Sequence, residues 1–358
     1  MRYPDCLVFD IGGTTFRGGV FSSSQHLSEP LIRKPSPSFF NQPGASTADL
    51  QQQLLESILA TVEHLRSVHS QKVLRHIGIA VPGPTDLNGT IRMAPPLWGK
   101  VRKAFPLKAL VEKHLKKVEC VVINDLTAAA ARYAHMPRFR PHRWICVVTV
   151  STGVGNKVLD TKTGEALLDP QGISGEIGHV TVNLDRQSPI CDCGRRGHLS
   201  AIASGGGTVR FARQWARTHP TDFQSSLISK WTGKESSRIT TGHLAQGARA
   251  GDRFALTVLD YVTLPMAQAL SVLVGSVGIG KIILVGGFAL GVGKPYLSAL
   301  RRNLIRVGVF GRSKRNIMNL VCLGNRDDDS GLIGAGLLAQ RQTLVQQARN
   351  ACPQQLRL

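Results

Sequence analysis

The stretch Asp10-Ile-Gly-Gly-Thr-Thr15, followed by Phe16-Arg-Gly-Gly-Val-Phe21, decides the fold of this 358-residue chain. Strand patterns at Cys6–Asp10 and Arg17–Phe21 flank it, so we expect a glycine-rich turn between two antiparallel strands. The standard nucleotide fingerprints instead run from a strand through a glycine loop into a helix. Glycines in the turn let backbone amides face a phosphate, and Asp10 can orient Mg²⁺ through water. The alternative is a glycine-rich hairpin that binds nothing.

Short apolar runs alternate with helical patterns along the rest of the chain, which predicts the α/β class. Further strands are expected at His76–Val81, Val121–Ile123, Ile145–Val150 and Lys281–Val285. Helices are expected at Thr47–Ser67, Leu107–Lys117, Leu126–His135, Gly205–His219, Phe254–Gly275 and Gly331–Ala348. The Ser- and Pro-rich stretch Ser22–Ala45 is expected to be a loop.

Composition excludes several classes of protein. Hydrophobic residues make up 42% and charged residues 19%, as in ordinary globular proteins. Seven cysteines do not resemble a secreted disulfide scaffold, and no uninterrupted apolar run is long enough for a membrane span. We therefore expect a cytoplasmic protein that has no membrane partner. The net charge of +21 suits anionic ligands such as nucleotides.

Two further loops could contact a nucleotide. Val150-Ser-Thr-Gly-Val-Gly155 again lies between strands, and the Thr152 hydroxyl and Gly153 amide can donate to phosphate oxygens. Val285-Gly-Gly-Phe288 follows a strand, and the small residues Gly286 and Gly287 let an adenine or ribose approach the backbone. Each loop alone also fits an ordinary tight turn. The recurrence of Gly-Thr turns near residues 12 and 153 suggests a duplicated fold.

Asn124 and Asp125 follow the expected strand Val121–Ile123 and precede a helical pattern. One interpretation is helix capping, for which Asn and Asp are preferred. The other places Asp125 at the carboxyl end of a strand, where open α/β sheets bind ligands. There the carboxylate can accept the proton of a hydroxyl that attacks a γ-phosphate. The two roles are compatible.

A cysteine and histidine cluster predicts a metal site. His179, Cys191, Cys193 and His198 follow the spacing H-x11-C-x-C-x4-H. Four thiolate and imidazole ligands suit a closed tetrahedral Zn²⁺ site with a structural role. The alternative is two free cysteines and two surface histidines. Glu176 and His179 can also present polar groups to a polyhydroxy substrate, because one His179 nitrogen stays free when the other binds zinc.

Seven motifs in order resemble the ROK family of sugar kinases, within the actin-like ATPase and sugar kinase superfamily. They are Asp10-Ile-Gly-Gly-Thr, Val81-Pro-Gly-Pro, Asn124-Asp125, Ser151-Thr-Gly-Val-Gly, Gly175-Glu-Ile-Gly-His, Cys191-x-Cys-Gly-x-x-Gly-His and Val285-Gly-Gly. Together they run from about residue 6 to residue 340. No single motif decides the assignment, whereas the ordered set is specific.

The resemblance implies two actin-like domains flanking a cleft, with ATP, Mg²⁺ and a structural Zn²⁺. It implies residues 1–120 as the first domain, joined by the helix 336–358, and 121–335 as the second. Asp125 matches the general base and Asn124, Glu176 and His179 match the sugar contacts. The phosphate-loop and nucleoside positions match at Asp10, Gly12, Gly13, Thr14, Thr152, Gly153, Gly286 and Gly287. A homodimer is the usual assembly of such kinases.

Two positions depart from the family pattern. Ser200 replaces a glutamate that contacts hydroxyls near the anomeric carbon in the family's hexokinases, and Asn156-Lys157 replaces glycine and a small or apolar residue. Losing a charged hydrogen bond to the substrate costs about 1.5–3 kcal/mol, which argues against glucose. The altered set resembles the branch that phosphorylates C7-cyclitols such as valiolone-type compounds. Glucokinase, hexokinase and N-acetylhexosamine kinase activities remain alternatives.

Two other functions compete with a small-molecule kinase. Some family members are repressors with an N-terminal helix-turn-helix, but only nine residues precede Asp10 here. The basic stretches Lys100–Lys117 and Arg301–Arg315 are typical of solvent-exposed helix faces, so we expect no nucleic-acid partner. A non-catalytic sugar sensor is disfavoured because Asp125 and all three loops are intact.

Overall fold

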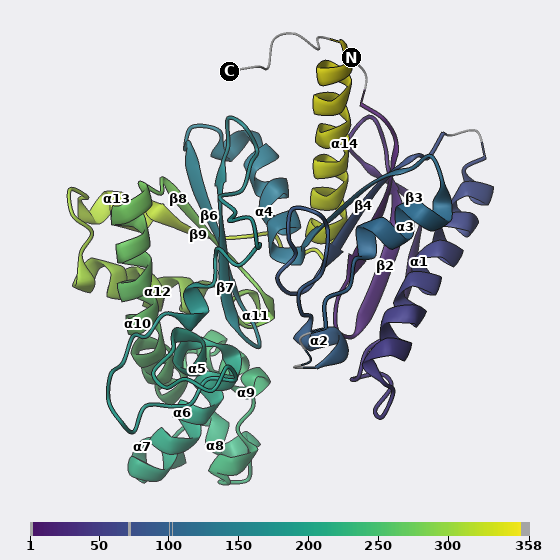
Figure 1. Cartoon of the computed structure of the whole chain (residues 1–358). Helices are drawn as coiled ribbons and strands as arrows, with labels where there is room; N and C mark the ends of the chain where they lie inside the picture. Colours follow the sequence, from purple (N-terminus) through teal and green to yellow (C-terminus); the bar gives the residue numbers. More distant parts are fainter. Residues whose placement is uncertain (1–2, 71–72, 100, 102, 352–358) are drawn as a thin grey trace. The chain divides into compact units, whose positions relative to one another are not determined.

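The computed structural model describes residues 3–70, 73–99, 101 and 103–351 of the chain. Two compact units are formed, the first from residues 1–136, 164–174 and 327–358 and the second from 137–163 and 175–326. Helices and strands alternate in both (Figure 1), so the predicted α/β class is confirmed. The division into folding domains near residue 120 stays a prediction.

A five-stranded mixed sheet forms the centre of the first unit, in the order β3-β2-β1-β4-β5. β1 pairs antiparallel with β2 and parallel with β4, and β4 pairs parallel with β5. The strands are β1 (Cys6–Ile11), β2 (Thr15–Phe21), β3 (Leu27–Pro35), β4 (His76–Val81) and β5 (Glu119–Asn124). The carboxyl ends of β1, β4 and β5 therefore meet at one edge of the sheet.

The prediction of a loop over Ser22–Ala45 is wrong where the chain forms β3. This strand lies at the edge of the sheet and pairs only with β2. Its residues are all exposed or half-buried, so the apolar pattern of a buried strand is missing. An edge strand also tolerates prolines such as Pro30, because their missing amide is not needed on the open side.

Helices cover both faces of this sheet, as Figure 1 shows. α1 (Thr47–Val68) and α3 (Leu107–Leu115) pack on the face that carries Phe9 and Ile11. α14 (Ser330–Ala351) packs on the face that carries Cys6 and Val8. The remaining helices of this unit are α2 (Pro95–Trp98) and α4 (Asp125–His135), of which α4 packs against α14.

The second unit contains a four-stranded sheet in the order β7-β6-β8-β9. Its strands are β6 (Trp144–Val150), β7 (Val154–Asp160), β8 (Lys281–Val285) and β9 (Val321–Leu323). β6 pairs antiparallel with β7 and parallel with β8, and β8 pairs parallel with β9. An antiparallel hairpin followed by parallel strands thus occurs in both units, which explains why two Gly-Thr turns recur in the sequence.

Short and long helices surround this second sheet. They are η1 (Pro137–Phe139), η2 (Ile177–His179), α5 (Leu199–Ala203), α6 (Gly205–Thr218), α7 (Pro220–Gln224), α8 (Leu227–Trp231), η3 (Ser236–Arg238), α9 (Thr241–Arg249), α10 (Arg253–Val277), α11 (Gly287–Val292), α12 (Lys294–Val307) and α13 (Lys314–Leu320). Among the described helices, α10 alone has the length and apolar composition of a membrane span. It packs against α12, and Val258, Leu259 and Met266 lie in the core of the unit.

Candidate functional site

The first glycine turn connects β1 and β2 as predicted. The Gly12 amide donates to the Thr15 carbonyl at 2.9 Å, which closes the turn. A Cβ atom at Gly13 would lie 2.7 Å from the Pro96 carbonyl oxygen, so a side chain cannot fit there without movement. The Thr14 carbonyl accepts hydrogen bonds from the Ser36 amide at 3.1 Å and from Asn41 Nδ2 at 2.9 Å. The turn is therefore held in one conformation by its surroundings.

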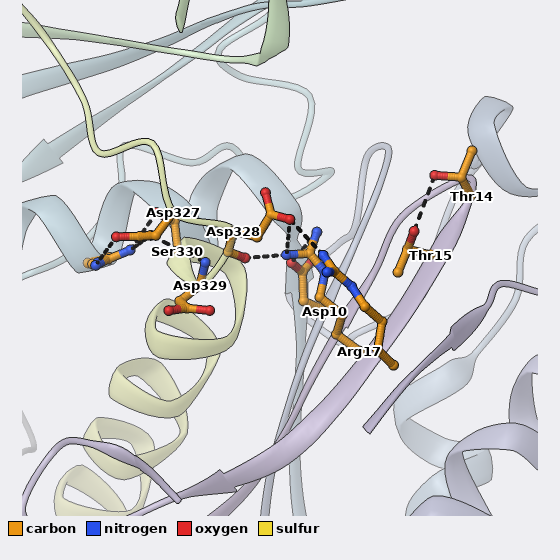
Figure 2. A network of polar contacts seen from close by, with 10 residues as sticks. Asp10, Thr14, Thr15, Arg17, Asp327, Asp328, Asp329 and Ser330 are labelled. Carbon is orange, nitrogen blue, oxygen red and sulfur yellow. Dashed lines mark hydrogen bonds and ion pairs between the residues drawn. The ribbon is translucent and has the colours of Figure 1, made fainter. Parts of the chain in front are cut away.

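Asp10 lies directly before this turn, opposite Arg17 in the antiparallel register. The residue is only 9% exposed, and its Oδ2 lies 3.5 Å from Arg17 Nη2 (Figure 2). Burial raises the pKa of the Asp10 carboxyl above its ordinary value, although the Arg17 charge acts in the opposite direction. A Cβ atom at Gly331 would lie 2.3 Å from Asp10 Cγ. Glycine at the start of α14 therefore makes room for this carboxylate.

A network of acidic and basic side chains continues from Asp10 to the start of α14 (Figure 2). Arg17 donates to the Asp328 backbone carbonyl, and the Asp328 carboxylate accepts from Arg33 Nη2 at 2.6 Å. Arg132 donates to Asp327 Oδ2 at 2.9 Å. Sequence reasoning missed Arg17 and Asp328. Arg17 could have been found, because a closed turn at residues 12–15 places it opposite Asp10.

Asn124 and Asp125 lie at the carboxyl end of β5, next to the turn that follows β4. Asn124 Oδ1 accepts from the Leu126 and Thr127 amides at 3.0 and 3.2 Å, while its Nδ2 donates to the Gly83 carbonyl at 3.1 Å. The capping interpretation therefore holds for Asn124. One amide hydrogen of its side chain is left for another acceptor, since an Asn carries two.

Asp125 is the first residue of α4, and its Oδ1 accepts the Leu126 amide hydrogen at 2.7 Å. A carboxylate at a helix N-terminus is stabilised in its charged form by the helix dipole and the free amides. A charged carboxylate is what a general base requires before it takes a proton. The structure thus places Asp125 where the second interpretation expected it, at the end of a parallel strand.

The second and third glycine loops lie close together in the second unit. The Ser151 amide donates to the Gly153 carbonyl at 2.9 Å, and the Thr152 and Gly153 residues are exposed. A Cβ atom at Gly286 would lie 2.6 Å from Thr149 Oγ1, at the end of β6. Gly286 also has a φ of +91°, a conformation that favours glycine. The two predicted nucleotide loops are thus neighbours at one edge of this sheet.

Glu176 directly precedes the short helix η2, and His179 is the last residue of that helix. The Ile177 amide donates to Asn156 Oδ1 at 3.3 Å, which fixes the segment to β7. The side chains of Glu176 and His179 are about half exposed, and Glu176 Oε2 lies 3.9 Å from His179 Nε2. Both polar groups are therefore accessible to a ligand.

The predicted metal ligands converge. The ligand atoms of His179, Cys191, Cys193 and His198 all lie within 4.8 Å of one another. The two Nδ1 atoms are 3.4 Å apart, and Cys193 Sγ lies 3.2 Å from His198 Nδ1. A tetrahedron with metal–ligand bonds of 2.0–2.3 Å has edges of about 3.3–3.8 Å, so this spacing fits zinc. The glycine at position 197 permits the approach, because a Cβ there would lie 1.7 Å from the Asn183 carbonyl oxygen.

The electrostatics of this cluster also suit a metal ion. Burial lowers the pKa of the His198 imidazole, which keeps the ring neutral and able to ligate. Burial raises the pKa of the Cys191 thiol, so a cation is needed to hold its thiolate form. Both ring nitrogens that face the cluster are Nδ1 atoms, and Nε2 of His179 is left facing Glu176. A metal would thereby fix the position of a candidate substrate residue.

Ser200, one of the two departures from the family pattern, has a structural partner. Its Oγ accepts the Val154 amide hydrogen at 2.8 Å, next to the second glycine turn. A Cβ atom at Gly178 would lie 2.6 Å from the same oxygen. The sequence could not reveal this bond, because the partners are 46 residues apart. The Ser200 hydroxyl thus connects the residue after the second glycine turn to α5.

Comparisons with known proteins agree with this arrangement. The ROK family model matches residues 6–342. The chain is 34% identical over 335 residues to the C(7)-cyclitol 7-kinase of Streptomyces hygroscopicus subsp. limoneus, covering 94% of this chain and 93% of that protein. It is 32% identical over 347 residues to the 2-epi-5-epi-valiolone 7-kinase of an Actinoplanes species, covering 93% and 92% respectively.

A solved structure shows the same fold. The ROK glucokinase of Streptomyces griseus, crystallised in complex with glucose and AMPPNP, matches with a TM-score of 0.68 at 23% identity. The match covers 94% of this chain and 99% of that one. The predicted two-domain actin-like fold is confirmed by this likeness, and by its family model and its sequence relatives the chain belongs to the ROK family.

Proposed function

We propose that this protein is an ATP-dependent kinase that transfers the γ-phosphate to a primary hydroxyl of a C7-cyclitol. The observation that carries the proposal is the position of Asp125, a carboxylate bonded to the Leu126 amide at the start of α4. The curated relatives named above, similar over more than nine tenths of the chain, are C7-cyclitol kinases. Glucokinase, hexokinase or N-acetylhexosamine kinase activity is the alternative within the same family.

In this mechanism Asp125 accepts the proton of the acceptor hydroxyl as its oxygen attacks the γ-phosphorus. Asn124, Glu176 and His179 orient the acceptor through hydrogen bonds. Backbone amides at Gly13, Thr14, Thr152 and Gly153 bind the phosphates, Gly12 closes the first loop, and Gly286 and Gly287 admit the nucleoside. Asp10 would hold Mg²⁺, whose chemical contribution is to neutralise charge on the phosphate oxygens.

We assign zinc a structural role in the same proposal. All four ligands come from the protein, so no position is left open for a reacting group. Bound zinc would tie His179 to the hairpin that carries Cys191 and Cys193. Metal analysis after mild purification is expected to find one zinc per chain, and removal by a chelator is expected to raise the KM for the acceptor. Retention of full acceptor affinity without zinc would contradict this role.

The surroundings of Ser200 support the proposed preference for a cyclitol over a hexose. Its hydroxyl oxygen accepts a hydrogen bond from the Val154 amide, and it offers a sugar no carboxylate. A hexose would lose the charged contact near its anomeric carbon, whereas a cyclitol has no anomeric carbon. The departure therefore removes a contact that only one of the two substrate classes uses.

The proposal is tested by incubating the purified protein with MgATP and separate acceptors: C7-cyclitols, glucose, mannose and N-acetylhexosamines. ADP release measures turnover, and phosphorus NMR of the product locates the new phosphate ester. We expect the highest kcat/KM with a C7-cyclitol and an ester on its exocyclic oxygen. A higher kcat/KM with glucose would favour the alternative, and binding of acceptors without turnover would favour a sensor.

We also propose that the protein assembles as a homodimer, as expected from the family resemblance. Light scattering coupled to size exclusion gives the mass in solution. A mass of two chains is expected, and a mass of one chain at micromolar concentration would contradict the proposal.

A further inference from the structure

The second unit contains a long stretch of sequence that has no acidic residue. Residues 261–326 include nine lysines and arginines in total and no aspartate or glutamate. Asp260, directly before the stretch, pairs with Arg302, and its Oδ1 lies 3.0 Å from Arg302 Nη2. The stretch thus carries nine positive charges in a chain of net charge +21, and the kinase mechanism above uses none of them.

Some of these cations are used within the fold, and others are not. Arg301 and Arg312 each donate from Nη2 to a backbone carbonyl at 2.7 Å. Three further side chains are exposed and make no hydrogen bond or ion pair with the described part of the chain. They are Arg306 at the end of α12 and Lys314 and Arg315 at the start of α13. Their charges are therefore available to a partner.

The loop between α12 and α13 (Figure 1) presents an aromatic ring among these charges. Phe310 is fully exposed, more so than any other large hydrophobic residue that the structure describes. Its neighbour Val309 is buried in the core of the unit, and the Arg312 amide donates to the Val309 carbonyl at 3.0 Å. The loop is thus anchored at Val309, while the next side chain lies in solvent.

Glycines on both sides hold the tip of this loop clear of the rest of the protein. Gly308 and Gly311 have φ angles of +79° and +72°, a conformation that favours glycine. A Cβ atom at either position would meet no atom within 4 Å. Phe310 is four residues from Arg306 and four from Lys314, so each Cα lies within about 15 Å of the Phe310 Cα.

The exposed face of α13 continues the same surface. Met318 is exposed and lies four and three positions after Lys314 and Arg315, which places the three side chains on one helix face. Ile317 and Leu320 are buried instead. We define the tip patch as Arg306, Phe310, Lys314, Arg315 and Met318. It combines apolar groups with three cations and contains no acidic residue.

The charge of the tip patch discriminates between possible partners. A symmetric contact with a second copy of the chain would place the three cations of one copy against the same cations of the other. Single-stranded nucleic acid is held by a track of several aromatic side chains, whereas the tip patch has one. An anionic lipid surface fits both features, because its headgroups attract cations and its interface accepts an aromatic ring.

We propose that the tip patch binds the surface of an anionic phospholipid bilayer, with Phe310 inserted at the level of the headgroups. One ring and three cations give reversible binding and no permanent anchor. The sequence predicts no membrane partner because it lacks a spanning run, but a surface contact needs none. Neither nucleotide nor acceptor takes part, so the result of the test is independent of the proposed kinase function.

The test measures cosedimentation of the full chain with vesicles of phosphatidylcholine alone or with about 30% phosphatidylserine, at about 0.1 M and about 1 M salt. Phe310→Ser removes the ring, and Lys314→Gln combined with Arg315→Gln removes two charges. Phe310→Trp reports insertion, because its additional emission over wild type should be quenched by brominated phospholipid.

Two matched controls lie elsewhere in the second unit. Leu184→Ser removes another highly exposed apolar side chain. Lys230→Gln combined with Lys234→Gln lowers the net charge by the same amount at two exposed positions. All of these side chains are exposed, so the unfolding temperature and the turnover without vesicles should match wild type in every variant.

Wild-type protein is expected to bind the anionic vesicles at least about tenfold more tightly than the neutral ones, and to be released by high salt. Phe310→Ser should weaken binding by about tenfold, since the buried ring is lost. The Lys314 and Arg315 double variant should weaken it by about 25-fold, at about fivefold for each cation. Both controls should stay within about threefold of wild type.

Equal binding to neutral and anionic vesicles would overturn the inference, and so would equal losses in the patch variant and the Lys230 and Lys234 control, which would indicate net charge alone. An unquenched Phe310→Trp would refute insertion. Binding to a DNA oligonucleotide under conditions where vesicles are not bound would assign the patch to nucleic acid. A dimer that dissociates in Phe310→Ser would assign it to a contact between copies. Either result would replace the lipid surface as its partner.

Discussion

The two glycine turns occupy equivalent places in the two sheets but are held by different forces. The first turn, at residues 12–15, lies beside the buried Asp10 carboxylate and its partner Arg17. Arg17 also donates to the backbone of Asp328, just before α14. The second turn, at residues 151–153, is held by hydrogen bonds between neutral groups, as far as its bonds are described. The Val154 amide donates to Ser200 Oγ, and the Gly205 amide donates to the Ser151 carbonyl at 2.8 Å.

This difference separates two demands on a phosphate-binding turn. A buried charge near the turn can orient a cation, but it is sensitive to packing and to pH because its desolvation must be offset. Neutral bonds fix the backbone without that sensitivity, and each contributes about 0.5–1.5 kcal/mol. We therefore expect the first turn to respond to substitutions that move a charge, and the second to substitutions that remove one bond.

Among substitutions that distinguish the two turns, Gly331→Ala should have the largest effect, because it disturbs the first turn. The new Cβ would lie 2.3 Å from Asp10 Cγ, so the carboxylate must move. A displacement of about 1 Å near the reacting groups lowers turnover by about 100-fold. Steady-state kinetics measure the change. Gly291→Ala in α11 is the control, since its Cβ would meet no atom within 4 Å and its turnover should stay near wild type. Equal activity of the two variants would contradict the claim that Gly331 keeps the Asp10 carboxylate in its position.

A smaller effect is expected from Ser200→Ala, which disturbs the second turn. The buried Val154 amide loses its acceptor, at a cost of about 1–3 kcal/mol in the free energy of unfolding. Denaturant titration measures this loss. The KM for ATP should rise by only a few-fold, because the Ser151 and Gly205 bonds remain. A loss of stability below about 0.5 kcal/mol would show that the bond does not support the turn.

The smallest effect is a pH dependence that distinguishes the turns. Since burial raises the pKa of Asp10, the folded state holds this proton more tightly than the unfolded state. The stabilisation that comes from the protonated Asp10 carboxyl is therefore lost as pH rises from the ordinary pKa of an aspartate through the raised pKa of Asp10. Asp10→Asn removes this titrating carboxyl. The stability of the Asp10→Asn variant relative to wild type should therefore increase as pH rises from the ordinary aspartate pKa to the raised pKa of Asp10.

Thermal unfolding of both proteins across the acidic range, without added metal, measures this difference. Ser151→Ala serves as the control from the second turn and should track wild type at every pH. A relative stability of Asp10→Asn that decreases with rising pH would show that the Arg17 charge, not burial, controls this carboxyl.

The hairpin around Asp10 and the N-cap at Asn124 could be predicted from sequence, because each depends on residues close together in the chain. β3 could not, because an exposed edge strand with Pro30 carries no buried alternation. The roles of Ser200 and Gly331 were also inaccessible. Their partners, Val154 and Asp10, are distant in sequence and are brought near only by the packing of α5 and α14.

The zinc cluster is intermediate between these cases. Its ligands could be predicted because residues 179–198 form one local segment, and their convergence depends on glycine turns within it. The charge network around Arg17 was missed, although the pair of Arg17 and Asp10 is close in sequence. The rest of the network comes from Asp327 and Asp328, more than 300 residues further along the chain.

The turnover of Asp125→Asn with MgATP and a C7-cyclitol tests the kinase mechanism most directly. The amide keeps the shape of the side chain and its bond to the Leu126 amide, but it cannot take a proton. We predict that kcat falls by about 10²–10⁴-fold while the calorimetric affinity for the acceptor stays within a few-fold of wild type. An unchanged kcat would contradict the assignment of Asp125 as the base.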